Sequence, residues 1–237
     1  MKICQTGGFS IFQSEEDRLF NLIIKNAGDN IKDQLINSHK NIIKSIEENI
    51  VHDYTIYIVD NGSEFQIDLS NHKNLKYIKI EDQSIEGITG AWNKGIHYAY
   101  QDDCDVIINS NDDLLLNKDV NKFIDYIIND PEKEICVYGP RPDAGQPLDN
   151  RIIKYPTVGV EIKKVVNGFF FAFSRNHYEK YRFTSEKYFN ANNKHSTEGK
   201  WAGQEGQFIE NCEKGCKCKL INFCWIDHVK ERGWKRL

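Results

Sequence analysis

The stretch that most constrains how this chain folds is residues 106–116, with the sequence Val-Ile-Ile-Asn-Ser-Asn-Asp-Asp-Leu-Leu-Leu. Its first three residues are β-branched, which favours a strand covered on both faces, as in a parallel sheet between helices. The polar residues that follow, 109–113, are expected at the carboxyl end of this strand, where open α/β sheets bind their ligands. Two adjacent carboxylates are costly to bury without a cation. The stretch therefore predicts a site for a divalent metal that carries a phosphate, or else a solvated turn.

Hydrophobic periodicity predicts strands and helices that alternate along most of the chain. Residues 19–24 and 54–59 are typical of strands, and the apolar residues between 31 and 50 recur at helical spacing, which makes a β-α-β unit. Residues 1–17 show no clear period, and we interpret them as an irregular or edge element. Further strands are expected at 75–80, 135–138, 158–166, 168–173 and 219–225, and further helices at about 87–100, 119–128, 175–181 and up to about 212. This order predicts a single α/β domain with a mixed, mostly parallel sheet flanked by helices.

Two connections near strand ends have the composition of binding loops. Asp60 is a carboxylate at a strand tip and precedes Asn61-Gly62-Ser63, which is also an ordinary turn. Small residues between 87 and 96 stand at the start of a helix, where free amides favour a phosphate, although tight helix-on-sheet packing explains them equally well. Residues 139–149 contain three prolines and predict a long surface loop, and residues 184–203 predict a mobile one.

Composition excludes some classes of partner. The net charge of -4, with acidic and basic residues interspersed, offers no general attraction for nucleic acid. No stretch is apolar and long enough to span a bilayer, and the first residues lack a secretory apolar region, so we expect a soluble, cytoplasmic protein. The seven cysteines are odd in number and scattered, which predicts reduced thiols. The cluster of Cys212, Cys216, Cys218 and Cys224 lacks paired Cys-x-x-Cys knuckles and is interpreted as buried thiols rather than a zinc site.

Several motifs follow one another in a definite order. They are the strand end Asp60-Asn61-Gly62-Ser63, a Gly-x-x-x-x-x-Asn-x-Gly loop at 87–95, Asn111-Asp112-Asp113, an aromatic strand that ends in arginine at 168–175, Trp-x-Gly-x-Glu at 201–205, and a late His228. In this order they resemble the motifs of the GT-A fold glycosyltransferases, most closely the family 2 type, which uses nucleotide-sugar donors. The resemblance extends from about residue 19 to residue 228.

The resemblance implies a role in donor binding for several matching residues. Asp60 would recognise the nucleotide base, with Asn26 near it at the end of the first strand, and Asn111 would touch the ribose. Asp113 would bind a divalent cation, Mn2+ or Mg2+, that bridges the diphosphate, and Asp112 would lie beside the sugar or the ribose. The expected donor is a nucleotide sugar, with UDP as the first choice of nucleotide.

The same resemblance implies how the reaction would be catalysed. Asn93 and Lys94 would also contact the donor, His228 would complete the metal or phosphate shell, and Glu205 would be the base. The metal would stabilise the departing nucleoside diphosphate while the base takes the proton of the acceptor hydroxyl, and backside attack would invert the anomeric carbon. The acceptor is expected to be a carbohydrate, a glycoprotein or a glycolipid.

The chain departs from the family pattern at three positions. Asn111 replaces the first acid of the Asp-x-Asp motif, and a ribose contact needs only its side-chain oxygen. Gly206 stands where many relatives have a second acid, so the base is Glu205 or a nearby acid such as Glu210. Trp92 stands where relatives often carry an arginine that can meet the phosphates, and this charge would have to come from a lysine or arginine elsewhere.

The motifs also suggest a division of the chain and leave two alternatives open. Within a single domain of residues 1–237, the donor half would span about 19–117, the acceptor half about 118–228, and a basic tail 229–237. One alternative is a sugar-phosphate nucleotidyltransferase, although Gly7-Gly8 lacks the Thr-Arg sequel of those enzymes. The other is a GT-A fold protein that binds carbohydrate without catalysis, since a fold does not imply a function.

Overall fold

The computed structural model describes residues 2–9, 31–60, 69–72, 74–79, 83–111, 114–142, 158–181 and 205–228. Its strands are β1 (Lys2–Phe9), β2 (Asp53–Asp60), β3 (Leu75–Lys79), β4 (Val106–Ser110), β5 (Leu114–Leu115), β6 (Cys136–Pro142), β7 (Val160–Lys163), β8 (Phe170–Ser174) and β9 (Lys217–His228). Its helices are α2 (Ile31–Asn49), α3 (Gln83–Gln101), α4 (Asp119–Asn129), the short 3-10 helix η2 (Lys133–Ile135), α5 (Arg175–Lys180) and α7 (Glu205–Glu213).

The strands form one mixed sheet in the order β3-β2-β1-β4-β8-β6-β9-β5, with β7 also paired to β9. The pairs β3–β2, β2–β1, β1–β4 and β6–β9 are parallel, whereas β8 is antiparallel to both β4 and β6. It follows that β1, β2, β3, β4, β6 and β9 all run in one direction. The predicted α/β fold with a mixed, mostly parallel sheet flanked by helices is confirmed.

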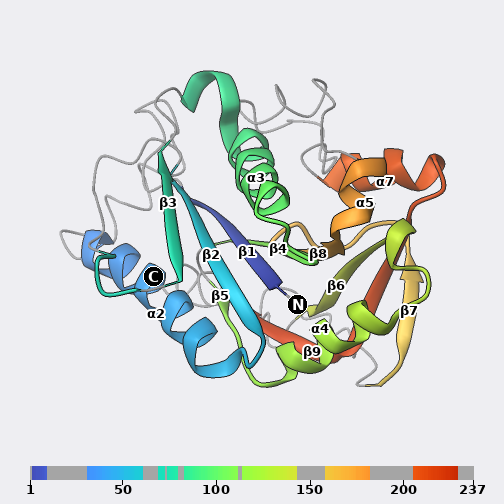
Figure 1. The fold of residues 1–237 in the computed structure, drawn as a ribbon, viewed down its shortest axis with the longest axis horizontal. Coiled ribbons are helices and arrows are strands. Elements are labelled where there is room, and N and C mark those ends of the chain that lie inside the picture. The colour runs from blue at the N-terminus through green and yellow to red at the C-terminus, as the bar shows by residue number, and fades with distance from the viewer. Residues whose placement is uncertain are drawn as a thin grey trace, which may run out of the picture.

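Helices cover both faces of this sheet (Figure 1). One core, on the side of α2 and α4, joins Ile43 and Phe123 to strand residues such as Ile108. The other core, on the side of α3, α5 and α7, joins Trp92 and Phe208 to the opposite face. Val106, Ile107 and Ile108 are buried between the two layers, as the β-branched run predicts.

The first strand differs from its prediction. Lys2–Phe9 is β1, a central strand that is hydrogen-bonded to β2 on one side and β4 on the other, so the interpretation as an irregular or edge element is wrong for these residues, and residues 10–17 lie outside the described part of the chain. Within Lys2–Phe9, only Ile3, Cys4 and Phe9 are strongly apolar. The strand conformation is stabilised by β2 and β4, which are distant in sequence. The predicted strand at 19–24 and the predicted loops at 61–63 and 184–203 lie outside the described residues.

Two other boundaries also differ from the prediction. Helix α3 begins at Gln83, so Gly87 and Gly90 lie within the helix rather than at its start. Strand β6 continues to Pro142, although the prolines predicted a loop from 139. Proline cannot donate a backbone hydrogen bond, and the register between β6 and β9 shifts between Pro140 and Arg141, which accommodates the missing donor.

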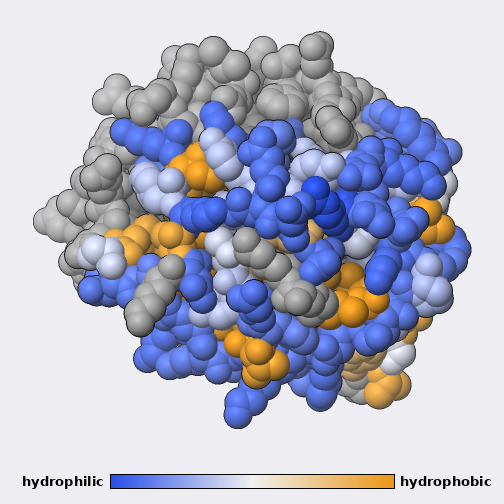
Figure 2. Space-filling view, viewed as in Figure 1, coloured by the Kyte–Doolittle hydropathy of each residue, from blue (hydrophilic) through white to orange (hydrophobic). Residues whose placement is uncertain are grey.

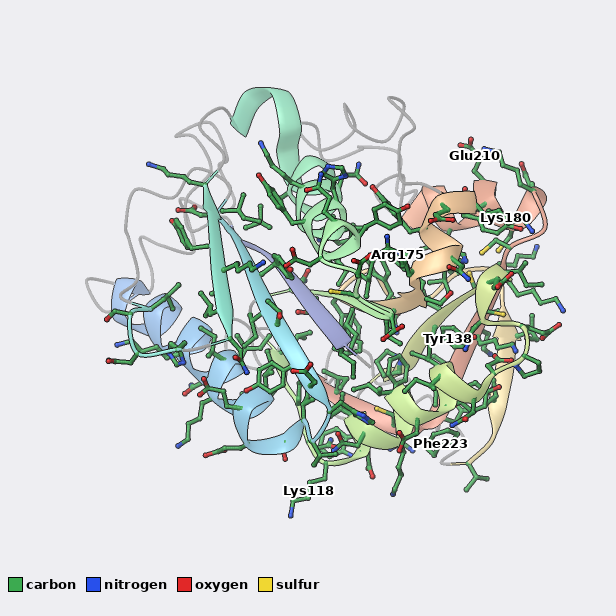
Figure 3. The ribbon with its side chains drawn as sticks, in the orientation of Figure 1. Lys118, Tyr138, Arg175, Lys180, Glu210 and Phe223 are labelled. Atoms are coloured by element: carbon green, nitrogen blue, oxygen red, sulfur yellow. The ribbon has the colours of Figure 1, made fainter. Side chains whose placement is uncertain are left out.

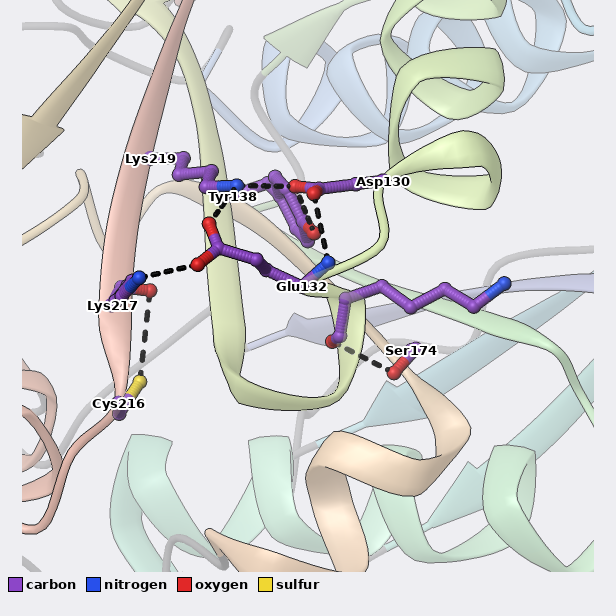
Figure 4. Close-up of polar contacts among 8 residues, drawn as sticks. Asp130, Glu132, Tyr138, Ser174, Cys216, Lys217 and Lys219 are labelled. Carbon is purple, nitrogen blue, oxygen red and sulfur yellow. Dashed lines mark hydrogen bonds and ion pairs between the residues drawn. The ribbon is translucent and has the colours of Figure 1, made fainter.

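A buried ionic network stabilises the end of α4, which stops before Asp130-Pro131 as predicted (Figure 4). The Lys219 ammonium donates to the Asp130 carboxylate at 2.6 Å and lies 2.9 Å from Glu132, and the Tyr138 hydroxyl donates to Asp130 at 2.8 Å. Burial alone would raise the pKa of Asp130, but the bonds from Lys219, the Glu132 amide and Tyr138 outweigh it and lower that pKa. The network joins α4, β6 and β9.

The cysteines only partly follow the prediction. Cys216, Cys218 and Cys224 are buried free thiols, and the Cys212 sulfur lies 3.6 Å from that of Cys218. Burial, followed by the neighbouring Cys218, raises the pKa of Cys212 to about 12, so this thiol is protonated at neutral pH. Cys104 belongs to a disulfide, so the prediction of reduced thiols is wrong for that residue.

The described surface is mainly polar. Figure 2 shows hydrophilic residues over most of the described part of this face, with hydrophobic residues in small, separate patches. Within the described ranges, the structure contains no helix with the length and apolar character needed to cross a membrane.

Candidate active site

The carboxyl ends of the parallel strands lie at one edge of the sheet. Asp60 closes β2, Ser110 closes β4 and His228 closes β9. Strand β1 lies between β2 and β4, so the ends of β2 and β4 are two strand spacings apart, or about 10 Å. This edge is the position at which open α/β sheets bind ligands.

Asp60 is 3% exposed, and its carboxylate accepts a hydrogen bond from the Tyr77 hydroxyl of β3. The two residues are diagonal neighbours, since Tyr77 is opposite Ile58 in the parallel register and Asp60 is opposite Lys79. Burial, and then the Asp60 carboxylate, raise the pKa of the Tyr77 hydroxyl. That hydroxyl therefore remains a hydrogen-bond donor at neutral pH. Sequence reasoning missed Tyr77, because only the β2–β3 register brings it to Asp60.

Asn93 and Lys94 are half-buried in the middle of α3. Ala91, two residues earlier, packs on Val59, the residue before Asp60. Ala91 of α3 therefore lies close to the carboxyl end of β2, and Asn93 and Lys94 follow it along the helix.

Trp92 points into the core rather than toward this edge. Its side chain is 2% exposed, and its ring lies 5.2 Å from that of Phe171, which in turn lies 4.9 Å from Phe208 of α7. At the position where the resemblance predicts an arginine facing the phosphates, this chain therefore has a packing residue that joins α3, β8 and α7.

The polar residues after Ile108 are divided between strand and loop. Asn109 and Ser110 are the last two residues of β4, at its carboxyl end as predicted, but they are buried within the strand and pair with Phe171 and Phe170. Asn111 is the first residue beyond the strand and is half-buried. Its backbone N–H donates to the Phe169 carbonyl at 2.8 Å. Asp112, Asp113 and the predicted donor residue Asn26 lie outside the described residues.

The last residue of β9 returns to the end of β4. His228 is paired with Leu114 of β5, and Leu114 follows Asp113 directly in the sequence. One predicted metal-binding residue, His228, therefore lies opposite the residue that follows the other, Asp113, in the sequence. Among the side chains that the structure describes, no group of three or more His, Cys, Asp or Glu forms a metal site.

Glu205, the predicted base, is the first residue of α7. Phe208, three residues later, is fully buried against Phe171, and this contact anchors the first turn of the helix to β8. Glu205 therefore begins a helix whose first turn is fixed against the sheet.

Arg175, the arginine of the aromatic strand motif, lies away from this edge. Strand β8 is antiparallel to β4 and places Ser174 opposite Val106, at the amino end of β4. The Arg175 guanidinium donates to the Tyr100 carbonyl at 2.6 Å and pairs with Asp103 at 2.8 Å, between α5 and the end of α3 (Figure 3). These contacts give Arg175 a structural role.

A protein-family model matches most of the chain. A model described as glycosyl transferase family 2 matches residues 36–204, more than half of the chain. Among curated proteins, none matches.

Two solved structures share the fold. GalNAc-T7, in a crystal structure with UDP, GalNAc and Mn2+, is 13% identical with a TM-score of 0.64, over 96% of this chain and 43% of that chain. Residues 1–349 of TarS from S. aureus are 11% identical with a TM-score of 0.57, over 94% of this chain and 58% of that chain. The chain thus spans less than two thirds of either protein chain, and these identities establish the fold alone.

Proposed function

The chain belongs to glycosyl transferase family 2, and we propose that this glycosyltransferase moves a sugar from a UDP-sugar to a hydroxyl group of a carbohydrate, a glycoprotein or a glycolipid. The observation that carries the proposal is the pairing of His228 with Leu114. The Cα atoms of such antiparallel partners are separated by about 4.5 to 5.5 Å. This pairing brings the end of β9 to the residue next to Asp113.

We propose that two residues assigned to this edge would hold a divalent metal. Asp113 would bind Mn2+ or Mg2+, with His228 completing the shell, since carboxylate oxygens are the ligands that these hard cations prefer. The metal would supply positive charge that stabilises the departing nucleoside diphosphate. The presence of UDP and Mn2+ in the GalNAc-T7 structure, which has the same fold, supports this choice of ligands.

The chain's own residues would position the donor. The Asp60 carboxylate would bind the base, Asn111 the ribose, and Asp112 the sugar or the ribose. Asn93 and Lys94, which follow the contact of Ala91 with Val59, would reach the diphosphate side, where Lys94 would provide a positive charge that Trp92 does not.

Glu205 would act on the acceptor. An acceptor hydroxyl is a poor nucleophile until a carboxylate takes its proton, and such general bases typically contribute 10²- to 10⁴-fold in rate. Attack on the anomeric carbon from the face opposite the diphosphate would invert its configuration. Residues 1–237 would act as one domain, with donor contacts before about residue 117 and acceptor contacts after it.

Release of UDP tests this function. The chain is incubated with UDP-glucose, UDP-galactose, UDP-N-acetylglucosamine and UDP-N-acetylgalactosamine, with Mn2+ or with chelator. We expect UDP release from at least one donor with Mn2+, and a fall of about tenfold or more in His228→Ala, since even loss of a residue that supports a metal ligand typically costs about 10- to 100-fold. His97→Ala, an exposed histidine of α3, is the matched control and should behave as wild type.

This assay, together with two further measurements, separates the alternatives. Binding of carbohydrate without turnover of any donor would favour the non-catalytic protein. Formation of a nucleotide sugar from a sugar phosphate and UTP, with release of pyrophosphate, would favour the nucleotidyltransferase. Full activity in excess chelator would remove the metal from the proposal and leave glycosyl transfer intact.

A further inference from the structure

We infer that Tyr77 is a positioning residue that keeps the Asp60 carboxylate as a hydrogen-bond acceptor, and that the pair thereby selects uracil over cytosine in the donor nucleotide. The inference rests on the proposed role of Asp60 in binding the base. It adds a residue, and a reason for base selectivity, that the motif containing Asp60 does not provide.

The sheet geometry places Tyr77 for this role. Asp60 is the last residue of β2 and is 3% exposed, whereas Tyr77 lies on β3, at the end of the strand order, and is 38% exposed. In the β2–β3 register the residue opposite Tyr77 is Ile58, two positions before Asp60, so both side chains are on the same face of the sheet. The Tyr77 hydroxyl reaches along this face and donates to one carboxylate oxygen of Asp60.

The hydrogen bond determines what the carboxylate offers to a ligand. A protonated carboxyl can donate, but an ionised one only accepts. Since the Tyr77 hydroxyl donates, it stabilises Asp60 as an acceptor, and the raised pKa of Tyr77 keeps the proton on the phenol. Uracil has an N–H at ring position N3, and this group can donate a hydrogen bond to a carboxylate. Cytosine has an unprotonated nitrogen at N3, which is itself an acceptor. Two acceptors facing each other in a nearly buried site leave both unsatisfied, which strongly disfavours the wrong base.

The chain contains a matched control for this pair. Tyr57 of β2 also donates its hydroxyl to a carboxylate, that of Asp102 just beyond α3, and Lys76 of β3 joins the same carboxylate. Tyr57 belongs to the core on the α3 side of the sheet, whereas Ile58, the partner of Tyr77 in the register, belongs to the core on the α2 side. Tyr57→Phe therefore removes a similar hydroxyl–carboxylate bond in the same region without touching Asp60.

The experiment measures dissociation constants for UDP and CDP with Mn2+ by calorimetry, for wild type, Tyr77→Phe and Tyr57→Phe. Wild type should prefer UDP by about 100-fold or more, the discrimination expected when a mismatched base leaves buried polar groups unpaired. Tyr77→Phe should weaken the binding of UDP and reduce the preference for UDP over CDP about tenfold, which is roughly the contribution of one hydrogen bond to a charged group. Tyr57→Phe should leave the ratio unchanged.

A second variant covers the case in which Tyr77→Phe folds poorly. Asp60→Asn replaces one acceptor oxygen with a donor amide, and the UDP-to-CDP ratio should fall at least as far as in Tyr77→Phe. If wild type binds UDP but both variants keep the wild-type preference for UDP over CDP, the inference is overturned and the proposed function still stands. Wild type that binds neither nucleotide would overturn the role of this site in donor binding, and the inference with it.

Discussion

The indole of Trp92 meets the ring of Phe171 edge to face, with 5.2 Å between the ring centroids and an interplanar angle of 68°. Phe171 makes a similar contact with Phe208, so the three rings connect the helix that carries Asn93 and Lys94 to the helix that begins at Glu205. The donor side and the acceptor side of the proposed site are therefore supported by one aromatic cluster.

Removing this indole should destabilise the protein rather than change its chemistry. Trp92→Ala should lower the free energy of unfolding by about 3 to 5 kcal/mol, because a large buried ring leaves a cavity. Tyr98→Ala, on the same helix and 40% exposed, should change it by about 0.5 kcal/mol or less. Both values come from urea unfolding. A Trp92→Arg protein of wild-type stability with tighter UDP binding would show that the position faces the phosphates after all.

The buried pair Lys219–Asp130 gives a second prediction. The two side chains are 7% and 3% exposed, so Lys219→Met leaves an uncompensated buried carboxylate and should cost about 3 to 5 kcal/mol of stability. Lys214→Met breaks an exposed pair with Glu210 and should cost about 0.5 kcal/mol or less. Denaturant midpoints of the two variants test this contrast. Equal midpoints would mean that the Lys219 network is no more important to stability than a surface pair.

Acid should destabilise the fold through His177. This histidine is fully buried, with its ring 5.4 Å from that of Phe173 and 4.9 Å from that of Tyr181, and burial lowers its pKa to about 3. The unfolded chain takes up a proton near pH 6.5 and the folded chain does not, so stability is lost as the pH falls from about 6.5 to about 3.

The expected slope from His177 is about 1.4 kcal/mol per pH unit at its steepest. Urea unfolding at pH 7, 6, 5 and 4 measures this slope. His177→Phe should flatten the curve, whereas replacement of the exposed His97 by glutamine should leave it unchanged. A parallel pH dependence in wild type and His177→Phe would contradict the prediction.

Glu205→Gln should separate transfer from donor binding. The amide keeps the shape of the side chain and loses its basicity, so transfer should fall by about 10² or more while UDP affinity changes little. Initial rates and calorimetry on the same preparation give both values. An equal loss of donor affinity would place Glu205 against the sugar; unaltered transfer would redirect the search to Glu210.

Local patterns predicted the parts of the fold that are encoded locally. The β-branched run at 106–108 and the Asp130-Pro131 stop of α4 were predicted correctly, since each depends on neighbours within a few residues. Strand β1 was missed because its conformation depends on β2 and β4 on either side of it. The prolines of β6 were misleading because a register shift accommodates them.

The site shows the same limit. The motifs proposed Asp60 and His228 as site residues, but the Tyr77 hydroxyl bond and the return of β9 to Leu114 are products of strand register. Register depends on the packing of whole strands, and no short motif in one strand specifies its partner.

The central claim is that Asp113 and His228 bind a metal together with a nucleoside diphosphate at this edge. The most direct measurement is electron paramagnetic resonance of free Mn2+ as the protein is added in the presence of UDP. Wild type should remove one equivalent of the free Mn2+ signal, and Asp113→Ala and His228→Ala should leave most of it, whereas His97→Ala should match wild type. An undiminished signal with wild type, or equal removal by Asp113→Ala, would contradict the account.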